Sequence, residues 1–143
     1  MDCGPTCLRM VAKYYGRTVP LDYLRVKTEH GKEGSSLLGL ADAAESIGLK
    51  TVGAKLSFKQ LINEAPLPAI LHWGQYHFVV LTPSSNPKKL KIADPAKGLV
   101  TYSKEEFLQN WISTHEQAEG KGIALLLERT QQFKELDFTG NEF

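Results

Sequence analysis

The sequence predicts an α+β fold in which N-terminal helices pack on an antiparallel sheet. Apolar residues recur every three or four positions in the first third of the chain, whereas short apolar runs separated by turn residues fill most of the remainder. Because the predicted helices and strands are largely segregated along the chain, an α+β arrangement is expected. The 143 residues are enough for one such domain.

Three helices are expected in the first third of the chain. The first starts at Cys3 and stops at Gly16. A short helix over residues 21–27 follows it. The third lies between Ser35 or Ser36, either of which suits the N-cap, and Gly48, a suitable C-terminal residue, and it carries apolar residues on one face.

The rest of the domain reads as a sheet with two further helices, over residues 57–63 and 104–111. Strands are expected at residues 51–56, 69–73, 76–82, 89–94, 99–102 and 123–127. We place the end of the domain at residue 129. Residues 130–143 turn polar and are expected to be a C-terminal extension, either a surface helix or the start of a linker.

Charge and composition exclude several classes of protein. The 17 basic and 16 acidic residues leave a net charge of +1, so no basic field is available for nucleic acid. No apolar run has the length of a transmembrane helix. The two cysteines form no disulfide framework and have no second Cys or His pair at metal-site spacing. We therefore expect a cytoplasmic domain without a metal or cofactor.

A cysteine at the start of the first helix is the main candidate for chemistry. Asp2 is the expected N-cap, and the positive end of the helix dipole favours the thiolate form of Cys3, which is the nucleophilic form. Cys7 lies one turn further along and is expected to pack in the core. On these residues alone, the alternative that both cysteines are small apolar core residues stays open.

A cysteine nucleophile needs a base, and the base needs a group that orients it. Among the four histidines, His30 and His115 lie in polar stretches and are expected to be solvated. His72 and His77 flank a short connection between two predicted strands. These two are the candidates for the base.

The predicted hairpin of residues 76–94 favours His77. If its loop is centred on Ser85 and Asn86, His77 lies directly opposite Asp94, with Cβ atoms about 4.5–5.5 Å apart. This distance suits an imidazole–carboxylate hydrogen bond. A slip of one residue would place the two on opposite faces, and an ordinary strand histidine beside a turn-forming aspartate remains the alternative.

Three segments together resemble the C39 peptidases: DCGPTCL at residues 2–8, YHFVVL at 76–81 and IADPA at 92–96. The resemblance covers nearly the whole chain. It implies a papain-like cysteine peptidase, found at the N-terminus of peptidase-containing ABC transporters. Such a domain removes the N-terminal leader of a bacteriocin-like or other secreted precursor after a Gly-Gly pair. Matched motif by motif, Cys3 is the nucleophile, His77 the base and general acid, and Asp94 its orienting group.

The resemblance also implies a glutamine a few residues before the cysteine, whose side chain helps to form the oxyanion hole. No residue of the printed sequence, which starts at Met1, matches it. The backbone N–H of Cys3 remains as a donor. Since the loss of one oxyanion donor costs about 10²–10³ in rate, we expect this chain to be slower than a version that carries the glutamine.

Large side chains near the three motifs are candidates for binding substrate. Trp73 and Tyr76 are expected to wall a narrow slot that admits two glycines. The resemblance implies that the leader peptide docks as an amphipathic helix, which requires an exposed apolar strip. The candidates for this strip are Leu37, Leu40 and Tyr14. Core packing is the alternative for these residues.

Two other functions stay open at this point. One is a non-enzymatic module that binds leader peptides for a transporter, which the missing glutamine favours and the complete Cys3, His77 and Asp94 set disfavours. The other is thiol redox chemistry or acyl transfer on the same three residues.

Overall fold

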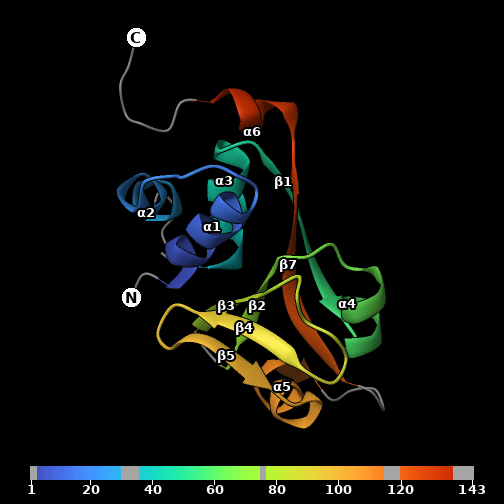
Figure 1. Ribbon diagram of the computed structural model, residues 1–143. Helices are drawn as coiled ribbons and strands as arrows, with labels where there is room; N and C mark the ends of the chain where they lie inside the picture. Colours follow the sequence, from blue (N-terminus) through green and yellow to red (C-terminus); the bar gives the residue numbers. More distant parts are fainter. Residues whose placement is uncertain (1–2, 30–35, 75–76, 115–119, 137–143) are drawn as a thin grey trace.

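A computed structural model describes residues 3–29, 36–74, 77–114 and 120–136 (Figure 1). Helices α1 (Cys3–Tyr14), α2 (Leu21–Glu29) and α3 (Leu37–Ser46) form one group, which lies on one side of the sheet. Helices α4 (Phe58–Glu64) and α5 (Lys104–Trp111) lie away from this group. The predicted α+β class is confirmed.

The described strands form one antiparallel sheet in the order β1-β7-β2-β3-β4-β5, and a short strand, β6, pairs with β7. Their bounds are β1 Leu49–Leu56, β2 Ala69–Trp73, β3 His77–Leu81, β4 Leu90–Asp94, β5 Gly98–Tyr102, β6 Ile112–Thr114 and β7 Lys121–Arg129. The sequence predicted each of these strands except β6. It also placed the ends of β7 two residues too far inward on each side, because the flanking residues are polar.

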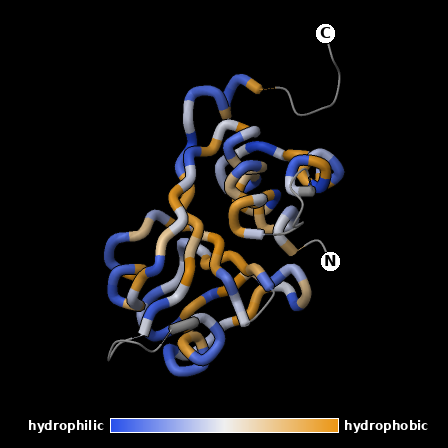
Figure 2. Tube along the Cα trace, turned by 180° about the vertical axis from the view of Figure 1, so that it is seen from behind, coloured by the Kyte–Doolittle hydropathy of each residue, from blue (hydrophilic) through white to orange (hydrophobic). Residues whose placement is uncertain are grey.

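Two hydrophobic clusters lie on the two faces of the central strands. Phe78 and Val80 of β3 belong to the cluster that contains the buried faces of α1 and α3. Val79 and Leu81 of the same strand belong to the cluster that contains the buried residues of α4 and α5. A strand covered on both faces reads as a continuous apolar run, which explains the sequence of β3. Figure 2 shows this apolar character concentrated in the middle of the molecule.

Residues that follow β7 also belong to the packed structure. Helix α6 (Gln131–Glu135) places Phe133 in the cluster of α1 and α3, where it is 1% exposed. The backbone carbonyls of Phe133 and Leu136 accept hydrogen bonds from Arg17, and the amide of Thr130 donates to the carbonyl of Gly48. The backbone nitrogen of Phe133 lies 2.4 Å from the point where a Cβ at Gly48 would stand, so the two segments touch directly.

Phe133→Ala is expected to lower the free energy of unfolding by about 3–5 kcal/mol, because it removes a large side chain from a closed cluster. Gln132→Ala, on the exposed side of the same helix, is the control and should change it by less than about 0.5 kcal/mol. Urea unfolding measures both. Equal midpoints for the two variants would show that α6 contributes nothing to the domain.

No helix among the described residues combines the length and the apolar character that a membrane crossing requires.

Candidate active site

The structure starts α1 at Cys3 and packs this helix against β3, the strand that begins with His77. Cys3 is 3% exposed and belongs to the cluster between the helices and the sheet. The predicted N-cap, Asp2, lies outside the described residues. A cysteine at the first residue of a helix has unpaired backbone N–H groups around it, as the sequence predicts.

His77 and Asp94 form a hydrogen bond, with His77 Nε2 at 2.7 Å from Asp94 Oδ1. The side chain of Asp94 is 2% exposed, whereas that of His77 is 23% exposed and therefore partly accessible. The amide of Ala96 donates to the same carboxylate oxygen at 2.8 Å. The predicted contact between the two side chains is confirmed. The Ala96 amide was missed, although an Asp followed by Pro at the end of a strand is typical of such a turn.

The strand register that led to this prediction is wrong by two residues. Val80 pairs with Ala93 and Leu81 with Ile92, so the register places Val79, and not His77, opposite Asp94. The reason is the loop: Asn86 bridges to Lys89, which moves the tip of the hairpin towards its second strand. Because side chains alternate with a period of two, a shift of two keeps both side chains on one face as diagonal neighbours.

Asp94 is held as a carboxylate. Burial, the largest single effect, opposes its ionisation, but the hydrogen bonds from His77 and the Ala96 amide and the charges of His77 and Lys97 together lower the pKa of Asp94 below its ordinary value of 3.8. An ionised carboxylate only accepts hydrogen bonds. His77 therefore carries its proton on Nε2, and this N–H donates the hydrogen bond to Asp94. Nδ1 is left as the nitrogen that can exchange a proton.

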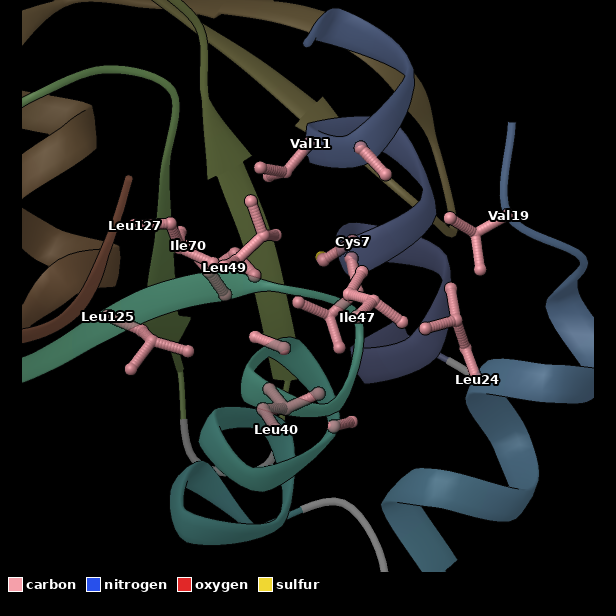
Figure 3. Packing of buried hydrophobic residues seen from close by; sticks show 14 of the residues in the cluster. Cys7, Val11, Val19, Leu24, Leu40, Ile47, Leu49, Ile70, Leu125 and Leu127 are labelled. Atoms are coloured by element: carbon pink, nitrogen blue, oxygen red, sulfur yellow. The ribbon is translucent and has the colours of Figure 1, made fainter. Parts of the chain in front are cut away.

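Cys7 has the environment of a structural residue. It is fully buried, and Figure 3 shows it on α1 among the residues of the hydrophobic cluster. Burial, followed by the nearby Cys3 and Asp94, raises the pKa of the Cys7 thiol well above its ordinary value. Asp94 thus acts electrostatically on α1, the helix that carries Cys3. The prediction that Cys7 packs in the core is confirmed.

His72, the other histidine within the described residues, takes no part in this pair. The ring of His72 packs against that of Phe78, with centroids 5.4 Å apart. His30 and His115 lie outside the described residues. Among the described residues, no group of three or more His, Cys, Asp or Glu side chains could hold a metal ion.

The candidates for substrate binding differ in how exposed they are, and two of them are buried. Trp73 and Leu40 lie in the core, 5% and 0% exposed, which is the alternative that the sequence left open. Trp73 packs at tilted angles against the rings of Tyr102 and Phe107, with ring centroids 5.4 Å apart in both pairs. Leu40 does not belong to an exposed strip.

Only part of the proposed apolar strip is accessible. Leu37 is partly buried against the cluster, whereas Tyr14 is 58% exposed. Leu38, which follows Leu37 in the chain, is 72% exposed. Tyr76 lies outside the described residues.

Comparison with known proteins decides the family. The family model described as "Peptidase C39 family" matches residues 1–117. This chain belongs to the peptidase C39 family. The arrangement of the C39 domain agrees with its solved relatives, which share its papain-like fold of helices packed on an antiparallel sheet.

Two solved structures are close to the C39 domain. The first is a double glycine motif protease from an AMS/PCAT transporter in complex with the leader peptide. It is 36% identical, has a TM-score of 0.76 and covers 90% of this chain and 85% of that one. The second is the peptidase domain of Streptococcus ComA, a bi-functional ABC transporter. It is 33% identical, with a TM-score of 0.70, and covers 90% of this chain and 92% of that one.

A longer relative shows how much of such a protein the C39 domain represents. The colicin V secretion/processing ATP-binding protein CvaB of Escherichia coli is 36% identical over 105 residues, which are 73% of this chain. The matched part spans only about 15% of the length of CvaB.

Proposed function

We propose that this chain is a cysteine peptidase domain that removes the N-terminal leader of a secreted precursor peptide after a Gly-Gly pair. The main support for this proposal is the hydrogen bond between His77, at the start of β3, and Asp94, at the end of β4. Strand β3 also packs against α1, the helix that begins at Cys3. In this proposal Cys3 is the nucleophile, His77 the base and general acid, and Asp94 the group that orients His77.

The first half of the reaction forms a thioester. The Cys3 sulfur, as the thiolate that results from proton transfer to His77 Nδ1, attacks the carbonyl carbon of the second glycine. The backbone N–H of Cys3 is available to the resulting oxyanion. As the intermediate collapses, the C–N bond breaks and the protonated His77 gives its proton to the leaving amine, which becomes the new N-terminus of the mature peptide.

The second half returns the enzyme to its starting state. A water molecule gives one proton to His77 Nδ1 and adds its oxygen to the thioester carbonyl. The C–S bond then breaks, the leader leaves as a carboxylic acid that releases its proton to the solvent, and Cys3 is again a thiolate beside a protonated His77. Asp94 stays ionised throughout, because its buried oxygen keeps the hydrogen bonds from His77 and Ala96 in both halves.

The substrate and partners rest on the relatives. A protease for a double glycine motif is 36% identical to this chain over most of its length, which supports a Gly-Gly leader as substrate. The relatives CvaB and ComA are transport proteins with further parts. We therefore infer that the transmembrane and ATPase parts of an ABC transporter are the partners, and that the domain works on the cytoplasmic face of the membrane.

The experiment is a cleavage assay with synthetic precursor peptides. A peptide with a Gly-Gly junction should be cut directly after the second glycine, as mass spectrometry of both products will show. The same peptide with valine in place of the second glycine should be cut at least about 10²-fold more slowly, because the larger side chain must fit beside the reacting carbonyl.

The assay also separates the alternative of a leader-binding module. The chain is measured as it is and with an N-terminal extension that carries a glutamine, for which we expect the faster rate. Binding of the leader by calorimetry, without cleavage by either version, would contradict the peptidase and favour the binding module.

A further inference from the structure

The glycine that follows Cys3 allows an unusually close contact between two helices. Gly4 is buried in the first turn of α1. A Cβ atom at this position would lie 2.6 Å from Cδ2 of Leu40, 3.3 Å from its Cγ and 3.4 Å from its Cδ1. Real Cβ atoms essentially never come within 3.0 Å of a heavy atom from a different part of the chain. Any side chain at position 4 therefore requires a displacement.

Leu40 has little room to give way. It is fully buried in the cluster that also contains Cys3 and Cys7, and Figure 3 shows it on α3 among residues of that cluster. The first turn of α3 also keeps its shape through its own hydrogen bonds, because the Ser36 hydroxyl accepts from the Gly39 amide at 3.0 Å and the Leu40 amide donates to the Ser36 carbonyl at 2.9 Å. A clash at position 4 is thus expected to move the first turn of α1 away from α3.

We propose that Gly4 and Leu40 are positioning residues for Cys3. Cys3 and Gly4 share the first turn of α1, so the contact that seats Gly4 against Leu40 also sets where the Cys3 sulfur lies relative to β3 and His77. The proposal rests on the proposed function of Cys3 and adds to it the physical reason for glycine at position 4. Both residues are buried in the fold.

Gly4→Ala tests the contact directly. Alanine ordinarily stabilises a helix relative to glycine, so an unhindered site would gain stability. We expect the opposite here, together with a fall in kcat of about 10-fold to 10²-fold and a change in KM of less than about threefold, because a displacement near 1 Å impairs attack more than binding. Gly53→Ala is the control, since its nearest new contact is an ordinary 3.5 Å from Leu37.

A second substitution distinguishes positioning from general damage. Leu40→Val shortens the side chain by one carbon, the amount that Gly4→Ala adds, and removes the Cδ2 atom that clashes. The Gly4→Ala/Leu40→Val double variant should recover kcat to within about threefold of the unmodified chain. Gly4→Ala/Leu40→Ala should also recover most of kcat while being less stable than Gly4→Ala, since it leaves a cavity.

A measurement without substrate keeps this test separate from the proposed function. The rate of alkylation of Cys3 by iodoacetamide is followed between about pH 5 and pH 9, with the modified cysteine located by tandem mass spectrometry. Gly4→Ala should slow alkylation at the acidic end, and Leu40→Val in the same chain should restore it. A chain that alkylates in this pattern but cuts no Gly-Gly peptide would contradict the peptidase and retain the positioning role. An unchanged pH profile and kcat in Gly4→Ala, or a double variant no better than the single one, would overturn the inference.

Discussion

Replacing Cys3 with alanine is expected to reduce cleavage of a Gly-Gly precursor to the uncatalysed background, a loss of roughly 10⁵-fold or more, because no thioester can form. Cys7→Ala is the matched control. Cys7 is fully buried, and the cluster that surrounds it accepts a small apolar residue, so its cleavage rate should stay within about threefold. Both are measured by initial rates of product formation, with circular dichroism to compare their folding.

The positions of the two free cysteines make this comparison informative. They lie four residues apart on one helix, so a general effect of removing a thiol from α1 would appear in both variants. Cleavage that persists after Cys3→Ala would refute the role of Cys3. Cleavage lost only after Cys7→Ala would point to the other thiol.

Asp94→Asn is expected to lower kcat by at least about 10²-fold while the fold is retained. The neutral amide still fits beside the Ala96 amide, but it does not stabilise the protonated His77 that forms during attack, and its NH₂ group favours the wrong tautomer of the ring. Asp42→Asn, an exposed carboxylate of α3, is the control and should leave kcat unchanged.

The same variant is expected to change how stability depends on pH. Since the pKa of Asp94 is lowered in the folded state, its ionised form stabilises the fold above the ordinary value of 3.8, and this contribution is lost as the pH falls through the lowered pKa. Asp94→Asn should therefore have a lower urea midpoint than the unmodified chain at pH 7, with the difference shrinking towards about pH 2. A constant difference across this range would show that the charge of Asp94 contributes nothing.

Local structure was largely readable from the sequence because its signals are local. Ser57 and Ser103 start α4 and α5 with capping boxes, in which the side chain of each serine and that of the residue three positions later satisfy two backbone amides. Ser36 caps α3 with a single hydrogen bond, which its side chain accepts from the Gly39 amide. These residue types mark helix starts without reference to the rest of the chain, so the bounds of the helices agree closely with the structure.

Elements whose stability depends on distant partners were harder to predict. Helix α6 has a polar sequence of five residues and no side-chain cap, and it is held instead by Phe133 and by Arg17 from the other end of the chain. Strand β6 has three residues and exists because β7 pairs with it. Neither has a periodic pattern long enough to predict it.

The sequence by itself determined the family resemblance and the segregation of helices and strands, and it led to the proposal that Cys3, His77 and Asp94 do the chemistry. Motifs and periodicity depend on neighbouring residues, and these are visible in one dimension. Only the tertiary structure decided the two-residue shift of the hairpin, the burial of Leu40 and Trp73, and the contact between Gly4 and Leu40. Each depends on how closely separate elements approach one another, which loop geometry and side-chain packing set in three dimensions.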